Sequence, residues 1–228
     1  MFSNNHLIVP AVAIGGYICY PKNLRINLVL LQRLSIIHNG LLILFSAWTF
    51  LSLSRLLYET GFVFESAYYF QNPLFDKIIY YFYLSKYYEF FDTFLLYLNG
   101  KQPIFLQKYH HIGAVICWHL CYIYKVDSIW LPSLVNAFVH TIMYSYYLGC
   151  LLKIQQVRFI KQYITSLQLV QLIVPNFIIL YYYSPPVETE FNHNINNLSR
   201  VYVTILIALF SQFYYKNYIV TKARTKAE

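Results

Sequence analysis

The residues of this sequence that could do chemistry gather around an adjacent histidine pair, His110 and His111. Gln107 precedes the pair by about one helical turn, and the three side chains fall within about 100° of the surface of a predicted helix. All three can therefore face one cavity. Imidazole groups transfer protons and attack electrophiles near neutral pH, so we predict general acid–base or nucleophilic chemistry here.

Three ionisable residues lie inside an apolar segment that precedes the histidine pair. Lys86, Glu89 and Asp92 are spaced at i, i+3 and i+6, which keeps them on one flank of a helix. Charges within a membrane span are costly and mark functional sites by default. The three groups either neutralise one another and orient a helix bundle, or they line a polar chamber and tune a neighbouring catalytic group. Both interpretations fit the sequence.

Two later apolar segments each carry a polar stripe at helical spacing. The stripes consist of Asn136, His140, Met143, Tyr144 and Tyr147 in one segment, and of Thr165, Gln168 and Gln171 in the next. A buried amide has to find hydrogen-bond partners. Four successive helices with inward polar stripes therefore predict one shared, hydrated chamber.

The composition indicates that apolar helices position these residues. Hydrophobic residues make up 58% of the 228-residue chain and charged residues 11%, whereas a soluble domain carries about 25% charged residues. These values exclude a soluble globular domain and a disordered chain. Since a transmembrane helix needs about 20 apolar residues, the sequence predicts an all-α polytopic membrane protein, with a single domain over residues 1–228. Its seven predicted transmembrane helices cover residues 7–20, 27–53, 74–98, 103–124, 129–152, 159–183 and 198–220, and the first is short for a span.

The net charge of +8 predicts how these helices are oriented. Lys and Arg lie between the apolar stretches and do not gather on one soluble face, which argues against nucleic-acid binding. One set of alternate loops is rich in Lys and Arg, and the positive-inside rule places these loops in the cytosol. The C-terminus is then cytosolic, with a tail at about residues 221–228. Its Arg224 and Lys226 resemble a dilysine-type retrieval signal of the endoplasmic reticulum.

Taken together and in this order, the polar residues of these four segments resemble the marker motifs of the ELO family of very-long-chain fatty acid elongases. That family's motifs are Lys-x-x-Glu-x-x-Asp-Thr, His-x-x-His-His, Asn-x-x-x-His-x-x-Met-Tyr and Thr-x-x-Gln-x-x-Gln. The matching residues are Lys86, Glu89, Asp92 and Thr93; Gln107, His110 and His111; Asn136, His140, Met143 and Tyr144; and Thr165, Gln168 and Gln171. The resemblance covers residues 39–215. The sequence departs from the pattern at Gln107, where a histidine is expected, and this weakens a metal-binding role for the motif.

The resemblance implies the first, condensing step of microsomal fatty acid elongation. ELO proteins join an acyl-CoA to malonyl-CoA and release CoA and CO2, which leaves a 3-oxoacyl-CoA two carbons longer. The family fold has seven transmembrane helices, six of which surround a central tunnel for the acyl chain. The resemblance also implies a location in the endoplasmic reticulum membrane, no metal ion and no cofactor beyond the two CoA substrates. The implied partners are membrane lipid and the reductases and dehydratase of the elongation cycle, and a homodimer is compatible with the family.

Roles for individual residues follow as hypotheses. We expect His110 to attack the acyl carbonyl and form an acyl-imidazole, with His111 and His140 transferring protons or stabilising an oxyanion. Lys108, near the cytosolic end, is the expected partner of the CoA phosphates. Three tyrosines at residues 181–183 are expected to cap the tunnel. The expected supporting polar network consists of Lys86, Glu89, Asp92, Gln107, Asn136, Tyr144, Gln168 and Gln171.

Three alternative functions leave more of the sequence unexplained. A histidine-box desaturase or hydroxylase needs several clusters of iron-binding histidines, whereas the chain has seven histidines, of which His6, His38 and His193 lie outside any cluster. A seven-helix receptor or transporter would use the three intramembrane charges but leaves the histidine, asparagine and glutamine motifs without a role. A catalytically weak ELO-like protein stays an alternative because of Gln107.

Overall fold

The computed structural model describes residues 4–21, 24–64, 68–183 and 190–220, and its regular structure within these residues is entirely helical. The α-helices are α1 (Ile8–Cys19), α2 (Leu28–Thr60), α3 (Pro73–Tyr88), α4 (Phe90–Leu98), α5 (Phe105–Ile123), α6 (Trp130–Leu151), α7 (Lys161–Tyr182) and α8 (Glu190–Tyr214). Short 3-10 helices cover Asn4–Leu7, Tyr69–Gln71, Asp127–Ile129 and Gln155–Ile160, and a π-helical segment, Tyr215–Val220, follows α8. The all-α prediction is confirmed.

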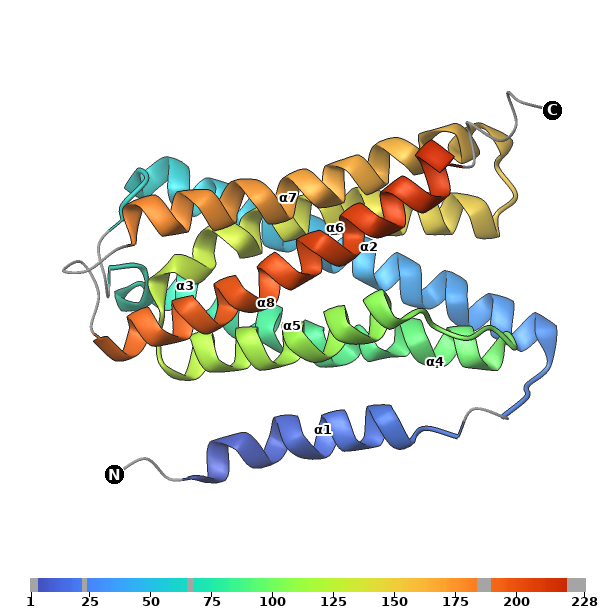
Figure 1. Ribbon diagram of the computed structural model, residues 1–228, viewed down its shortest axis with the longest axis horizontal. Helices are drawn as coiled ribbons and strands as arrows, with labels where there is room; N and C mark the ends of the chain where they lie inside the picture. Colours follow the sequence, from blue (N-terminus) through green and yellow to red (C-terminus); the bar gives the residue numbers. More distant parts are fainter. Residues whose placement is uncertain (1–3, 22–23, 65–67, 184–189, 221–228) are drawn as a thin grey trace.

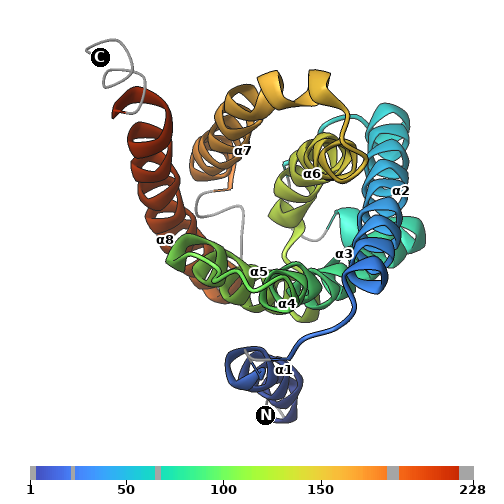
Figure 2. The same cartoon turned by 90° about the vertical axis from the view of Figure 1, so that its right-hand side faces the viewer.

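The helices from α2 to α8 form a closed ring, which Figure 2 shows from one end. Neighbours in contact around the ring are α2 and α3, α3 and α5, α5 and α8, α8 and α7, α7 and α6, and α6 and α2. α4 continues α3, and the helices run along the long axis of the molecule (Figure 1). Segments far apart in the sequence therefore share one interior, so that polar stripes on different helices can face one another.

α1 lies outside the ring and packs against α4 and α5 (Figures 1 and 2). The Tyr17 ring stacks on Phe90 of α4 with ring centroids 4.2 Å apart, and the Tyr17 hydroxyl lies 2.9 Å from the Thr93 hydroxyl. With 12 residues, α1 is about 18 Å long, whereas the hydrocarbon core of a bilayer is about 30 Å thick. The helix therefore has the short length that the sequence predicted.

Three helical segments are long and apolar enough to cross a membrane, namely Leu28–Thr60, Lys161–Tyr182 and Phe191–Val220. On α2, the apolar side chains of Leu34, Leu41 and Leu44 are exposed. A helix on the surface of a soluble protein would carry polar residues on that face, so this pattern suits contact with lipid. Helices also cover the remaining predicted segments, at the bounds given above.

Three predicted boundaries are wrong. The helix predicted to end at residue 53 continues to Thr60. The segment predicted as one helix at 74–98 is broken at Glu89, between α3 and α4, and the Ser85 hydroxyl in the last turn of α3 donates to the Phe82 carbonyl, a bond that bends helices. The last predicted helix starts at residue 198, whereas α8 begins at Glu190 and so extends about two turns further toward the N-terminus. The predicted tail at about 221–228 lies outside the described residues.

Candidate active site

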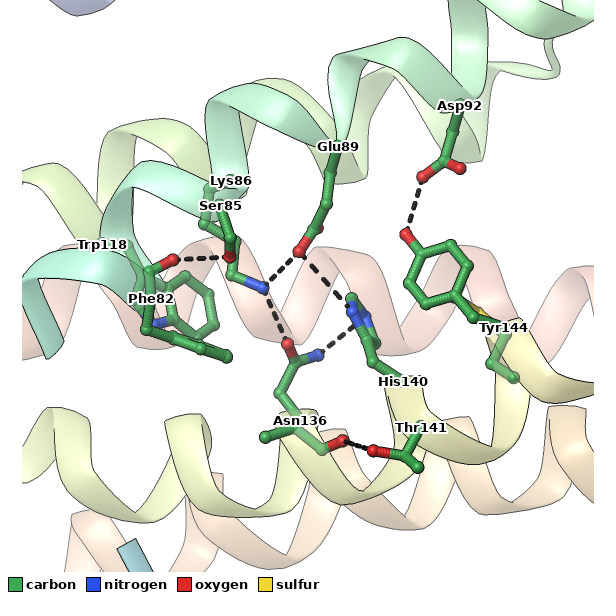
Figure 3. A network of polar contacts seen from close by, with 12 residues as sticks. Phe82, Ser85, Lys86, Glu89, Asp92, Trp118, Asn136, His140, Thr141 and Tyr144 are labelled. Carbon is green, nitrogen blue, oxygen red and sulfur yellow. Dashed lines mark hydrogen bonds and ion pairs between the residues drawn. The ribbon is translucent and has the colours of Figure 1, made fainter. Parts of the chain in front are cut away.

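Lys86, Glu89, Asn136 and His140 form a buried hydrogen-bonded network between the end of α3 and α6 (Figure 3). The Lys86 Nζ donates to Glu89 Oε1 at 2.7 Å and to Asn136 Oδ1 at 2.9 Å. Asn136 Nδ2 lies 3.1 Å from His140 Nε2, and His140 Nδ1 lies 3.5 Å from Glu89 Oε1. The Lys86 and Glu89 side chains are 2% and 3% exposed, so the ion pair compensates two charges that would otherwise be costly to bury.

This network fixes the proton position of neutral His140. An ammonium group can only donate, so the Asn136 oxygen faces Lys86 and the Asn136 amide nitrogen faces His140. Because that nitrogen donates, His140 Nε2 accepts, and the ring proton lies on Nδ1, toward Glu89. Both ring nitrogens of His140 thus have protein partners. The arrangement suits a group that donates or relays a proton, and it leaves the nucleophile role to the histidine pair on α5.

Asp92 on α4 connects two further side chains. Its Oδ1 lies 2.9 Å from His38 Nε2, and its Oδ2 accepts from the Tyr144 hydroxyl at 2.7 Å. His38 comes from α2 and is buried. His38 lies outside the histidine clusters of the sequence, as predicted, but its contact with Asp92 makes it part of the site. The spacing of residues in the sequence does not mark His38, because its partner Asp92 comes beside it only when α2 packs against α4 in the ring.

The histidine pair lies in the first half of α5. Gln107 Nε2 donates to the Thr93 hydroxyl of α4 at 3.2 Å. His111 is buried, and its Nδ1 has no hydrogen-bond partner. The half-buried His110 contacts Tyr202 of α8, whose hydroxyl lies 3.3 Å from His110 Nδ1 and donates to the His110 carbonyl at 2.9 Å. Tyr202 belongs to none of the sequence motifs, so the sequence analysis missed it.

One cavity of about 580 Å³ joins these groups inside the ring. Its walls include side chains from all four predicted polar stripes, which confirms the predicted shared chamber. These side chains are Glu89, Asp92, Gln107, His110, His111, His140, Met143, Tyr144, Tyr147, Thr165, Gln168 and Gln171. Lys86 is not part of the wall, because its ammonium group is enclosed by its polar partners and by the rings of Phe82 and Trp118, whose centroids lie 4.1 and 5.2 Å away.

Two basic residues, Lys101 and Lys161, also line this cavity. They lie at the end of the ring where α5 and α7 begin (Figure 1). Lys108, the predicted partner of the CoA phosphates, is not among the lining residues. It lies about 200° around α5 from His110, because successive helical residues are about 100° apart. The role predicted for Lys108 therefore gains no support from its position.

A second cavity of about 90 Å³ lies between α5, α6, α7 and α8. It is lined mainly by apolar side chains, including Ile129, Pro175 and Leu206. It shares His110, Gln171 and Leu172 with the larger cavity. His110 therefore lies where the larger cavity, which holds the polar motif residues, meets a smaller and more apolar one.

The three tyrosines at residues 181–183 do not line either cavity. Tyr181 is 77% exposed, and Tyr182 is exposed as well. Tyr183 is buried, but its hydroxyl accepts a hydrogen bond from Trp130 Nε1 at 3.0 Å, within the hydrophobic core at this end of the ring. The prediction that these residues cap a tunnel therefore gains no support from their positions, because consecutive helical residues point in different directions.

Glu89, His110 and His140 are close enough to hold a metal ion, with one possible ligand atom from each within 4.8 Å of the others. The Lys86 ammonium, however, lies 2.7 Å from the Glu89 carboxylate and competes with any cation for it. Asn136 also donates to one nitrogen of His140. The donor set therefore suits a metal ion poorly, and the expected metal-free site stays a prediction.

Comparison with known families gives an independent result. The sequence profile of the ELO family, described as the GNS1/SUR4 family, matches residues 8–226. The chain belongs to the ELO family. This membership confirms the resemblance predicted from the four motifs, and with three membrane-capable helices it identifies a multi-pass membrane protein. The receptor or transporter alternative has no support from it.

Several relatives of this ELO protein carry elongase names. It is 36% identical to fatty acid elongase sre1 of Dictyostelium discoideum over 145 residues, 61% of this chain and 53% of the relative. It is 39% identical to fatty acid elongase 3 of Trypanosoma cruzi over 149 residues, 60% of this chain and 48% of the relative. Fatty acid elongase A of Dictyostelium discoideum is 29% identical over 239 residues, 95% of this chain and 84% of the relative. The chain thus spans about half the length of the first two relatives, and no solved structure matches it.

Proposed function

We propose that this ELO protein catalyses the condensing step of fatty acid elongation, as a very-long-chain 3-oxoacyl-CoA synthase. An acyl-CoA and malonyl-CoA would give a 3-oxoacyl-CoA two carbons longer, with release of CoA and CO2. The observation that carries this proposal is the position of His110 at the junction of the larger cavity, which holds the polar motif residues, and the smaller, more apolar cavity. A thioester carbonyl at this junction would have its CoA on the polar side and its acyl chain on the apolar side.

The first step transfers the acyl group to the protein. His110 Nε2 attacks the thioester carbonyl, the C–N bond forms, the C–S bond breaks, and CoA leaves as a thiolate that takes up a proton. The His111 ring, with its centroid 5.5 Å from that of His110, is placed to supply this proton or to stabilise the oxyanion. The neutral His110 ring thereby becomes a cationic acyl-imidazolium.

The second step forms the carbon–carbon bond. Malonyl-CoA loses CO2, and the electron pair left on its C2 attacks the acyl carbon while the C–N bond to His110 breaks. The negative charge of the malonyl carboxylate cancels the positive charge of the acyl-imidazolium, so no net proton is needed. His140 has a ring nitrogen within 4.8 Å of one on His110, and the proton on its Nδ1, which points toward Glu89, would be shared with the enolate oxygen.

The surrounding polar residues hold this arrangement in place. Lys86 and Asn136 orient His140, and Asp92 orients Tyr144 at the cavity wall. Gln171 lines both cavities, and its buried Oε1 has no hydrogen-bond partner. Its amide is therefore available to a substrate group at the junction. No cofactor is required by these steps beyond the two CoA substrates.

We also propose the membrane location, the topology and the partners of the enzyme. We infer seven transmembrane helices in the endoplasmic reticulum membrane, a cytosolic C-terminus, and an acyl tunnel inside the ring of six helical segments. Lys101 and Lys161, which line the polar cavity, are better placed than Lys108 to bind CoA phosphates. A 3-oxoacyl product has to be reduced and dehydrated, so reductases and a dehydratase are the expected partners, besides membrane lipid and a second copy of the chain.

Fatty acid profiling of elongase-deficient yeast that expresses this chain tests the proposal. The wild-type chain should restore fatty acids two carbons longer than those of the host, and His110→Ala should not. His119→Ala is the matched control, because His119 is buried on the same helix and packs against Tyr87 rather than lining the cavity. A membrane-inserted wild-type chain without elongated products would overturn the function, and elongation by His110→Ala would overturn the nucleophile.

A further inference from the structure

Tyr202 of α8 reaches His110 because α5 has a gap in its side-chain surface at Gly113. A Cβ atom at Gly113 would lie 2.0 Å from Tyr202 Cε2 and 2.7 Å from Tyr202 Cζ, so the tyrosine ring occupies the space of the absent side chain. Tyr202 is 9% exposed and packs with Leu206 against α5. The contact places one phenol hydroxyl against a residue of the proposed catalytic pair.

The hydrogen bonds of this hydroxyl determine the proton position of His110. A phenol has one proton, and Tyr202 donates it to the His110 carbonyl oxygen at 2.9 Å. The hydroxyl oxygen, 3.3 Å from His110 Nδ1, can then only accept from that nitrogen. The proton of neutral His110 therefore lies on Nδ1, and the lone pair lies on Nε2, free to act as a nucleophile.

We propose that Tyr202 is a positioning residue that holds His110 in its Nδ1-protonated form for acyl transfer. The inference rests on the proposed role of His110 as acyl acceptor. Acylation at Nε2 makes the ring cationic, and a hydrogen bond from a charged donor is stronger than one from a neutral donor. Tyr202 thus stabilises the acylated ring more than the free ring, and its effect belongs to the rate of acyl transfer and not to substrate binding.

The test measures acyl transfer to the purified full-length protein in detergent. The readout is the rate of CoA release from acyl-CoA in the absence of malonyl-CoA, over a range of acyl-CoA concentrations. Tyr202→Phe keeps the ring in its gap and removes the hydroxyl. We expect a rate about 10- to 100-fold lower at saturating acyl-CoA, the effect of losing a hydrogen bond to a group that becomes charged, with the half-saturating concentration unchanged.

Tyr109→Phe is the matched control. Tyr109 lies in the same α5–α8 contact, 5.4 Å from Tyr202 between ring centroids, and its hydroxyl donates to the Tyr202 carbonyl at 3.3 Å. It does not bond to His110, so its removal should leave the rate within about twofold. Equal losses in the two variants would show that the contact only packs the helices and would overturn the inference, as would a wild-type rate in Tyr202→Phe.

A spectroscopic measurement separates proton position from activity. Nitrogen-15 spectra of histidine-labelled protein, compared with those of His110→Ala, isolate the His110 signals. We expect the Nδ1-protonated pattern in the wild type and a mixture of both tautomers in Tyr202→Phe. An unchanged pattern in Tyr202→Phe would overturn the inference. CoA release by His110→Ala at the wild-type rate would instead overturn the proposed acyl acceptor, so the two failures are distinguishable.

Discussion

Asn136 determines the chemistry of His140 because its two side-chain groups can be satisfied in one orientation only. The oxygen accepts from Lys86, so the amide nitrogen donates to His140. Asn136→Leu removes both bonds and leaves a buried ammonium with one partner fewer. We expect the free energy of unfolding to fall by about 2–4 kcal/mol and condensation to be lost. Thermal unfolding in detergent and a condensation assay check this, and Asn217→Leu, at an exposed amide on the π-helical segment, is the control.

The role of His38 follows from its position, because its Nε2 lies 2.9 Å from Asp92 Oδ1. His38→Phe keeps a ring in the same space but removes the hydrogen bond to Asp92. The Asp92 carboxylate then has Tyr144 as its one remaining partner of the two, and its orientation is less well fixed. We expect condensation to slow by about tenfold, the effect of one lost hydrogen bond to a charged group. His193→Phe, on α8 and outside both cavity linings, should be far milder. Equal effects of the two substitutions would contradict a specific role for His38.

Some residues of the site could be predicted from the sequence and others could not. Glu89, His110 and His140 were predicted because charge or regular helical spacing marks them within apolar segments. His38 and Tyr202 carry no such mark, since a single histidine or tyrosine in an apolar helix is equally typical of packing. Their roles depend on the partner helix, and only the ring supplies that partner.

At the scale of elements, the contact between α5 and α8 depends on the absence of a side chain at Gly113. Gly113→Ala would place a methyl group 2.0 Å from the Tyr202 ring and force the helices apart or the ring aside. We expect the free energy of unfolding to fall by about 1–3 kcal/mol, the typical cost of overpacking, and acyl transfer to slow as it does in Tyr202→Phe. Gly40→Ala on α2 is the control, because no atom lies within 4 Å of its Cβ position and alanine favours a helix. Unfolding temperatures of the two variants test this prediction. An unchanged unfolding temperature in Gly113→Ala would contradict the close packing of Tyr202 on Gly113.

The elements themselves were largely predictable, and the exceptions have local causes. Apolar runs located all seven long helical segments, because length and hydropathy can be read from the sequence, whereas the short 3-10 helices such as Tyr69–Gln71 were not predicted. The break at Glu89 involves neither glycine nor proline, so nothing in the pattern of residues marks it. α8 begins at Glu190 in a polar stretch that hydropathy alone assigns to a loop.

At the scale of the whole molecule, the two lysines at one end of the ring should control access of CoA substrates. Lys101→Ala together with Lys161→Ala should raise the KM for malonyl-CoA by about tenfold, with little change in kcat, since lost phosphate contacts weaken ground-state binding. Lys153→Asn is the control, because Lys153 lies near the same end but outside the cavity lining, and asparagine tolerates its φ of 60°. A similar KM in the double variant and the control would show that net charge, and not position, governs binding.

The ring order of the helices was the least predictable feature. Sequence periodicity gives the inward face of each helix but not its neighbours, so only the structure could show that two cavities of different polarity meet at His110. One shared chamber could be predicted because the buried polar groups of four successive helices need hydrogen-bond partners, and they find them by facing one another.

The most direct measurement is condensation by the purified chain alone, with an acyl-CoA and radiolabelled malonyl-CoA and without the other enzymes of elongation. We predict a labelled 3-oxoacyl-CoA two carbons longer than the acyl-CoA supplied, with one CO2 released for each product, and no product from His110→Ala. If folded wild-type protein gives no such product, condensation is not its activity, and if His110→Ala forms the product at the wild-type rate, His110 is not the acyl acceptor.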